Sequence, residues 1–486
     1  MLRELEEAVT DSRVLRGLGY LKIDGVFSQS MTVLISNSFV IPMLLLLGAN
    51  SFVVGLYSGI ITVSALAQLV SPYFVKFFGS RKKVSVVFSF LSRFVLFVSS
   101  ILLVFGFSLS LFSFLLLFSL FYFLSNVSSG SFKFWMLDFV PRGIRGRFFA
   151  VRMMVSLIVA MFIGLLVALY IEFFTNGSLV SYDVPIFLAS LLGLVGLLFL
   201  ARIPEPALSP LRSVDFSSIQ RILRNGDIKR HLLAIFSVYF ALNLSFPFFV
   251  YYLLVNLGFN LVSVFFLSAL SQFSTIVFLP IWGKLIDSYG AKATLKFAVK
   301  IIALSLLIWP FTTLPYRHFF SVFLIGVFYF LIGVSVGGLN LASGLIAYYL
   351  VRGDGDQLVL SLNDVFVSIG SFSGSFVGAL LSIPFGFLEL SLTLNVDFSR
   401  ILTFYIIDLK GLDFLFVLSS VLALSFLSLF SKYKVDVNLD EEKNYYEIVY
   451  GFKRAVRTFR SQITLIFNGK SKASRSRRIE NVQSSR

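Results

Sequence analysis

Long apolar runs follow one another along almost the whole chain and are interrupted by glycine, proline and clusters of charge. A run of about 20 apolar residues is long enough to cross a hydrocarbon core of about 30 Å as a helix. Dividing the chain at the interruptions predicts twelve transmembrane helices, near residues 25–48, 52–75, 84–106, 110–137, 149–174, 183–201, 231–255, 260–285, 293–314, 319–349, 359–385 and 413–431. Because a helix satisfies its own backbone hydrogen bonds where water is absent, we predict an all-α membrane protein.

The polar stretch 202–230 separates the predicted helices into two groups of six. Its prolines and basic residues indicate a cytosolic linker between an N-terminal six-helix bundle, 25–201, and a C-terminal six-helix bundle, 231–432. Residues 1–24 are charged and amphipathic and do not resemble a cleavable signal peptide. We therefore predict a cytosolic N-terminal segment there.

Residues 433–486 form a basic tail, which we predict to be cytosolic and to contain an amphipathic helix. Its apolar residues recur at steps of three and four between basic residues, at Tyr445, Ile448, Phe452, Val456, Phe459, Ile463 and Phe467. We expect this helix to lie on the anionic lipid of the inner leaflet.

The composition agrees with this pattern and excludes several functions. The chain has 486 residues, of which 57% are hydrophobic and 14% charged, and that is more apolar surface than a soluble core of this size buries. Cysteine is absent, which excludes disulfides, thiol catalysis and thiolate metal sites. There is no phosphate-binding loop and no histidine or carboxylate cluster at catalytic spacing. We therefore expect no enzyme activity, no cofactor and no metal.

The net charge of +16 is mostly a signal of membrane topology. With the N-terminus inside, only Arg317, Arg400 and Lys410 of the 41 Lys and Arg residues fall outside, while Arg93 lies within the third span. This asymmetry predicts a protein of the cell membrane with both termini in the cytosol. We expect no nucleic-acid binding, because the chain has no basic and aromatic reading module. The segment 386–412 is too polar to span and is predicted to be an extracellular loop with one short element.

Two short polar stretches repeat at the inner ends of the second and eighth spans. They read "PYFVKFFGSRKKV" (72–84) and "GKLIDSYGAKATL" (283–295). The same interval separates Gly79 from Gly290 and Arg81 from Lys292. Related positions in two six-helix halves indicate an internal repeat, and hence two pseudo-symmetric bundles of the kind from which transporters are built.

The second stretch resembles the cytosolic signature of the major facilitator superfamily, G-x-L-x-D-x-x-G-x-K/R-x-x-L/I. Gly283, Leu285, Asp287, Gly290, Lys292 and Leu295 fit that signature position by position. "DFVPRGIRGRFFAVR" (138–152) is similar to the family's loop between helices 4 and 5. The first copy departs from the pattern, because Pro72, Phe74 and Lys76 replace glycine, leucine and aspartate.

In the family, helix 2 packs against helix 11 and helix 5 against helix 8, so each signature faces the other half. On this packing we predict an inner gate of charge pairs whose signs are exchanged between the halves. In the first copy, which contains Gly79, Lys76 and Arg81 face Asp354, Asp356 and Asp364; in the second, Asp287 faces Arg145, Arg147 and Arg152, with Asp138 in the same loop as these arginines. The plainer alternative is that these charges only follow the positive-inside rule.

The family's helices 1, 4, 7 and 10 line a central cavity. The polar residues that the resemblance places on these helices are Gln29, Asn37, Asn126, Lys133, Asn243 and Asn340, and Gln68 and Gln272 on spans 2 and 8 lie within reach. Each amide serves equally well as a hydrogen bond between packed helices. Asn126 and Lys133 are seven residues apart and share a helix face.

Arg93 is an intramembrane charge, which is costly and usually paired or facing water. Because helix 3 is peripheral in the family, we expect a structural role for it. No carboxylate is predicted deep within a span, since Asp24 falls near an inner end. This disfavours proton coupling and organic cations as substrates.

The predicted function is a secondary active or facilitative transporter that moves a small solute by alternating access, as a monomer. The competing hypothesis is a transporter-fold sensor or scaffold without transport. It is supported by the degenerate first signature and the basic tail.

Overall fold

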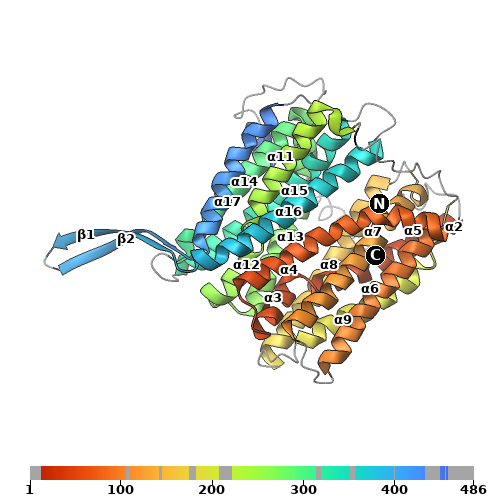
Figure 1. Cartoon of the computed structure of the whole chain (residues 1–486), viewed down its shortest axis with the longest axis horizontal. Helices are drawn as coiled ribbons and strands as arrows, with labels where there is room; N and C mark the ends of the chain where they lie inside the picture. Colours follow the sequence, from red (N-terminus) through yellow and green to blue (C-terminus); the bar gives the residue numbers. More distant parts are fainter. Residues whose placement is uncertain are drawn as a thin grey trace, which may run out of the picture.

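The computed structural model describes residues 12–104, 110–141, 145–174, 182–206, 220, 222–313, 319–350, 356–398, 400–432, 449–454 and 456–457. Twelve helices in this part of the chain are long and apolar enough to cross a membrane, which confirms the predicted number. They form two bundles that lie side by side, one built from the first half of the chain and one from the second (Figure 1).

The N-terminal bundle contains α2 (Ser12–Leu34), α3 (Asn37–Leu46), α4 (Ser51–Ser64), α5 (Ser71–Phe78), α6 (Arg81–Val104), α7 (Leu111–Phe139), α8 (Arg145–Phe174) and α9 (Asp183–Leu200). A 3-10 stretch, Ala65–Val70, joins α4 to α5 within the second span. Pro72 lies in the first turn of α5, where its missing N–H costs no helical hydrogen bond. Gly79 ends α5 with φ of 64°, a conformation that glycine adopts without strain.

The C-terminal bundle contains α11 (Gly226–Asn243), α12 (Phe248–Tyr251), α13 (Leu261–Tyr289), α14 (Ala291–Leu306), α15 (Phe319–Tyr349), α16 (Asp356–Phe385) and α17 (Asp413–Phe426). Its core is rich in large aromatic side chains, among them the fully buried Trp282 and Trp309.

We call the end of the bundles that carries Leu46, Ser51 and Leu261 the hairpin end. The opposite end, where α2 begins and the last span ends, is the terminal end.

Two spans are broken at corresponding positions. The first span breaks at Ile35 and Ser36 between α2 and α3, and the seventh breaks between Asn243 and Phe248. The interval that relates Gly79 to Gly290 also relates Ile35 to Phe246. The Tyr122 hydroxyl donates to the backbone carbonyl freed at Ile35, at 3.3 Å. Paired breaks of this kind in transporter halves lie beside the solute-binding region.

The loop predicted over 386–412 contains a β-hairpin. Strands β1 (Glu389–Phe398) and β2 (Arg400–Lys410) pair antiparallel, with one irregularity in register between Leu392 and Thr393. Apolar and polar residues alternate along β1, which is the period of a half-buried strand, whereas β2 contains consecutive apolar residues. We predicted one short element here, and the alternation along β1 was the sequence signal for a strand.

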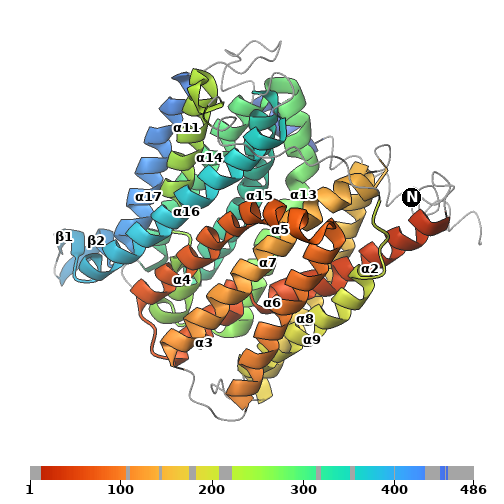
Figure 2. The same ribbon diagram turned by 45° about the vertical axis from the view of Figure 1, so that its right-hand side comes forward.

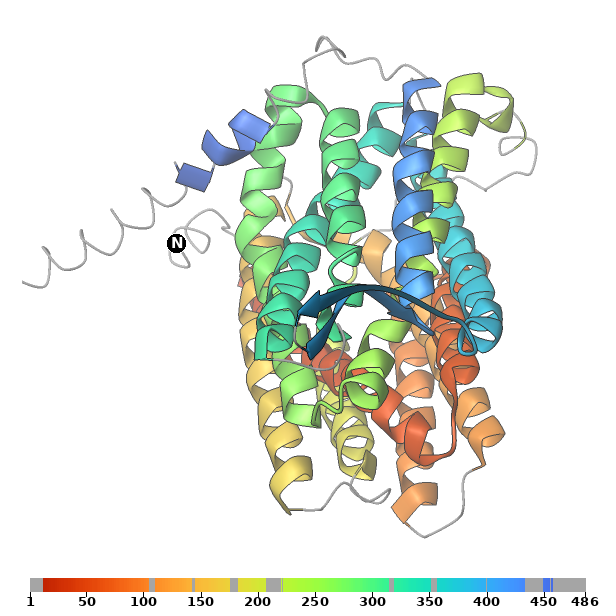
Figure 3. The same cartoon turned by 90° about the vertical axis from the view of Figure 1, so that its left-hand side faces the viewer.

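The two ends of the chain also differ from the predicted pattern. Helix α2 begins at Ser12 and continues without interruption through residue 24, because Leu18 and Leu21 are buried against the N-terminal bundle. The described part of the tail, 449–454 and 456–457, lies beside the C-terminal bundle (Figure 3). Its Phe452 packs against Trp282, with ring centroids 5.5 Å apart. In this part the apolar face therefore contacts protein, where we predicted contact with lipid.

Candidate functional site

The two bundles pack closely at the hairpin end. Helix α4 packs against α16 (Figure 2) and α8 against α13, as the resemblance implied. A Cβ atom added to Gly55 would lie 2.7 Å from Cβ of Ala379, and one added to Gly164 would lie 2.3 Å from the Phe265 ring. Small residues therefore permit the close approach of the helices at these contacts. The Oγ atoms of Ser38 and Ser268 add a hydrogen bond of 3.0 Å between the bundles.

A ladder of polar side chains runs along α4, α7 and the 3-10 stretch in the N-terminal bundle. Asn126 donates to Ser64 Oγ at 3.0 Å and accepts from Gln68 Nε2 at 3.2 Å. Lys133 Nζ donates to Gln68 Oε1 at 2.9 Å. Asn126 and Lys133 thus share a face, as predicted, and Gln68 joins them.

A second polar set lies in the C-terminal bundle. Asn340 Oδ1 accepts from the Tyr239 hydroxyl at 2.7 Å. Asn243 donates to the Tyr239 carbonyl at 2.9 Å and to Ser371 Oγ at 3.1 Å. These hydrogen bonds join α11, α15 and α16. Tyr239 was missed in the sequence because tyrosine is too frequent there to single out one residue.

One ion pair joins the first polar set to α16 of the other bundle. Lys133 Nζ lies 3.9 Å from Asp364 Oδ2, and the two side chains are 55% and 68% exposed. Both charged side chains are thus more than half exposed at the terminal end. The closely packed hairpin end and these exposed charges at the terminal end are the main asymmetry of the site.

Three other predicted cavity residues do not join either ladder. Gln29, Asn37 and Gln272 are half-buried, and the structure gives their side chains no hydrogen bond among the described residues. Asn37 is the first residue of α3, directly after the break in the first span. Their amide groups therefore remain available to a ligand.

The first-copy gate residues contact their own bundle. Arg81 forms an ion pair with Asp138 at the end of α7. Lys76 is exposed. Glu205, which we did not single out, accepts from Ser80 Oγ at 2.6 Å and from the Lys82 backbone N–H at 3.0 Å. These bonds hold the turn before α6 to the segment that follows α9.

The second-copy gate residues lie around the turn between α13 and α14. Leu285 is buried, Asp287 is exposed without an ion pair among the described residues, and Gly290 has φ of 86°. A Cβ atom on Gly283 would meet nothing within 4 Å. Lys292 follows in the first turn of α14. The side chains of Arg145, Arg147 and Asp356, and the whole of Asp354, lie outside the described residues.

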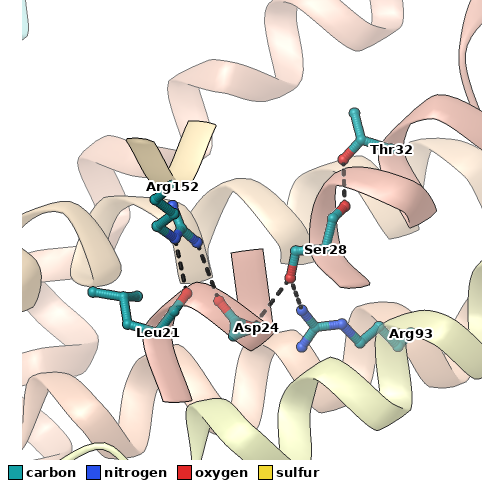
Figure 4. A network of polar contacts seen from close by, with 6 residues as sticks. All are labelled: Leu21, Asp24, Ser28, Thr32, Arg93 and Arg152. Carbon is teal, nitrogen blue, oxygen red and sulfur yellow. Dashed lines mark hydrogen bonds and ion pairs between the residues drawn. The ribbon is translucent and has the colours of Figure 1, made fainter. Parts of the chain in front are cut away.

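Arg152 was predicted to face Asp287, and the structure places it elsewhere. Its Nη2 lies 3.3 Å from Asp24 Oδ2, and its Nε donates to the Leu21 carbonyl at 2.9 Å (Figure 4). Asp24 is only 3% exposed, so a carboxylate is buried where we expected the edge of a span. The extension of α2 beyond the predicted boundary is the reason.

Arg93 belongs to the same buried network. Its Nη2 donates to Ser28 Oγ at 3.3 Å, and Ser28 in turn donates to Asp24 Oδ1 at 3.1 Å (Figure 4). Gly193 on α9 makes room for the arginine, since a Cβ atom there would lie 3.0 Å from its Cγ. One carboxylate thus faces two guanidinium groups at the junction of α2, α6, α8 and α9.

Comparison with known proteins adds three findings. The sequence profile described as Major Facilitator Superfamily matches residues 25–375. Among solved structures, a mutant of the nucleoside transporter NupG is similar with a TM-score of 0.65 and 14% identity, covering 85% of this chain and 100% of that chain. A D-xylose-proton symporter is similar with a TM-score of 0.63 and 12% identity, covering 89% of this chain and 99% of that chain. The xylose transporter XylE from E. coli in its inward open conformation has a TM-score of 0.56 and 12% identity, covering 90% of this chain and 98% of that chain. No curated protein matches by sequence.

Proposed function

Because this chain belongs to the Major Facilitator Superfamily, we propose that it is a secondary transporter, active or facilitative, which moves a small solute by alternating access. The observation that supports this most directly is the asymmetry between the two ends of the bundles. The hairpin end is held by glycine-mediated helix contacts, whereas Lys133 and Asp364 at the terminal end are more than half exposed. Rocking of the two bundles would close one end as it opens the other.

The solute binds between the two polar ladders in this proposal. Amide and hydroxyl groups of Asn126, Gln68, Tyr239 and Asn340 already form hydrogen bonds there, and an arriving solute exchanges them for its own. One lysine and one carboxylate flank the space, so their charges balance. We therefore propose a neutral or zwitterionic polar solute. The transporters with similar folds named for a nucleoside and for xylose carry hydroxyl-rich neutral solutes.

Solute flux into proteoliposomes tests the proposal. A panel of nucleosides, sugars, amino acids and peptides is offered to the purified protein, after thermal-shift screening selects compounds that stabilise it. We expect saturable flux of at least one compound and its loss in Lys133→Met, while Lys83→Met, at an exposed lysine outside the ladder and the predicted gate, retains it. Absence of flux for every stabilising compound would favour the sensor or scaffold.

The predicted gate belongs to the opposite conformation, in which the terminal end is closed. We propose that Asp287 then pairs with Arg145 or Arg147, without Arg152, which is held by Asp24. Partly exposed pairs contribute only about 0.2–1 kcal/mol each, yet a few together bias a two-state equilibrium. Asp287→Arg should slow transport, and the double variant with Arg147→Asp should restore it. If the double variant is no faster than the single one, the pairing is wrong.

The distribution of Lys and Arg supports a cell-membrane location with the terminal end in the cytosol. The chain contains no cysteine, so single cysteines can be introduced without removing native ones. A cysteine at residue 391, exposed on the polar face of the β-hairpin, should react with a membrane-impermeant thiol reagent on intact cells, and one at residue 76 should not. Reaction of both or of the opposite one refutes the orientation. We also propose that the protein is a monomer. Its tail beyond residue 457, which lies outside the described residues, is proposed to contact anionic lipid.

A further inference from the structure

The β-hairpin has one apolar face. Its cross-strand pairs alternate, so that Glu389 is opposite Lys410 and the next pair, Leu390 and Leu409, is apolar. The apolar pairs continue on the same face of the ladder as Leu392 with Ile407, Leu394 with Phe404 and Val396 with Leu402. The polar pairs between them include Ser391 with Asp408 and Asn395 with Thr403. Four successive apolar pairs on one face of a two-stranded sheet require a partner, because such a sheet has no core of its own.

At the base of the hairpin, where the side chains are described, this face is exposed. Figure 1 shows the hairpin projecting away from the helices, and ten residues of strand at about 3.4 Å each extend roughly 34 Å. Leu390 and Leu392 are 55% and 52% exposed. An exposed apolar surface of this kind marks an interaction site.

The apolar face continues the surface that α16 presents to lipid. Exposed apolar side chains recur along α16 at steps of three and four and lead into the hairpin: Phe376, Leu380, Ile383, Phe387, Leu388, Leu390 and Leu392. Phe387, in the turn between helix and strand, is 88% exposed. Helix α16 ends at Phe385, so the strip of exposed apolar residues passes from a spanning helix to the hairpin without interruption.

The base of the hairpin is fixed to the bundle. Lys410 Nζ lies 2.8 Å from Glu389 Oε1 and 3.2 Å from Asp408 Oδ2, which ties the two strands together. Asp413, at the start of α17, accepts from the Lys410 backbone N–H at 3.1 Å and from the Tyr252 hydroxyl at 2.9 Å. The hairpin therefore leaves the bundle in a defined direction, between the end of α16 and the start of α17.

We propose that the hairpin is a membrane-surface element whose apolar face rests on the lipid leaflet at the hairpin end. The partner is the apolar boundary of the bilayer and not a charged headgroup, because the hairpin carries acidic and basic residues in nearly equal number, at Glu389, Asp397, Arg400, Asp408 and Lys410. Binding is consequently independent of lipid charge and of salt.

Spin labels on the full-length protein test this inference. A label is placed at Leu394→Cys on the apolar face or, as the matched control, at Asn395→Cys on the polar face, in liposomes of phosphatidylcholine alone. Oxygen concentrates in lipid and a water-soluble nickel chelate in water, so the ratio of the two relaxation effects reports the surroundings of each label. We expect this ratio to be several-fold higher at residue 394 than at residue 395, at low and at high salt.

Two other results overturn the inference. Equal and high nickel accessibility at both positions means that the hairpin stands free in water. Low accessibility of residue 394 to both reagents means that it is buried in protein; if the protection is lost on dilution with lipid, the partner is a second copy of the chain. Both cysteine variants must elute as a single species, and neither outcome depends on whether the protein transports a solute.

Discussion

Asp24→Asn removes the only carboxylate of the buried network in α2 and tests what that network contributes. The variant loses the ion pair to Arg152, at 3.3 Å, and weakens the hydrogen bond from Ser28. At 3.3 Å and an effective dielectric constant of about 20, Coulomb's law gives roughly 5 kcal/mol for that pair. Measured losses for breaking one side of a buried pair are about 3–5 kcal/mol, because an uncompensated charge stays buried.

We therefore expect Asp24→Asn to lower the free energy of unfolding by about 3–5 kcal/mol. For a unit of about 150–250 residues, such as the N-terminal bundle, 1 kcal/mol corresponds to roughly 2–4 °C in Tm. The assay is thermal unfolding of the purified protein in detergent. Asp287→Asn is the matched control, since the same chemical change at an exposed aspartate without an ion pair among the described residues should cost less than about 0.5 kcal/mol.

The partner variants separate the ion pair from general packing. Asp24→Asn combined with Arg152→Met removes both members of the pair, so no unpaired charge remains at that position and part of the loss should be recovered. Arg93→Met should cost less than Asp24→Asn, because Nε and Nη1 of Arg93 have no hydrogen-bond partner among the described residues. The reasoning is refuted if Asp24→Asn behaves like Asp287→Asn, or if the double variant is no more stable than the single one.

Three further predictions concern other parts of the molecule. Gly55→Leu should prevent the close contact of α4 with Ala379 and so open the hairpin end. Cysteines placed between the bundles should then react faster with thiol reagents. Unchanged reactivity would show that this contact does not hold the hairpin end closed. Phe452→Ala should release the tail from Trp282 and lower Tm, by less than the about 3–5 kcal/mol that truncating a fully buried aromatic costs because Phe452 is half-buried, whereas Tyr450→Ala, at an exposed position, should leave Tm unchanged. Hydrogen bonds to the carboxylates of Glu389 and Asp408 raise the pKa of Lys410 above its ordinary value of 10.5. The bonds from Lys410 to these carboxylates are therefore complete below pH 10.5 and are lost as the pH rises through the raised pKa. A spin label at residue 392 should keep its mobility from about pH 7 to pH 9 and gain mobility only above 10.5, and an earlier change would contradict this assignment.

Much of the site was visible in the sequence because its signals are local. Asn126 and Lys133 were placed on one face by helical periodicity, and they do share the ladder through Gln68. The gate partners were less predictable. Arg152 and Arg81 both bond within their own bundle, because the nearest carboxylate in space is set by the extension of α2 and the end of α7.

The sequence by itself determined the twelve spans, the division into two bundles and the internal repeat, because hydrophobic length and glycine or charge at fixed intervals are written along the chain. Only the tertiary structure decided which end is closed, which charges meet and what covers an apolar face. Those features depend on residues that are distant in sequence, such as Gly164 against Phe265, Lys133 against Asp364 and Phe452 against Trp282. Their contact energies exist only once the helices have packed.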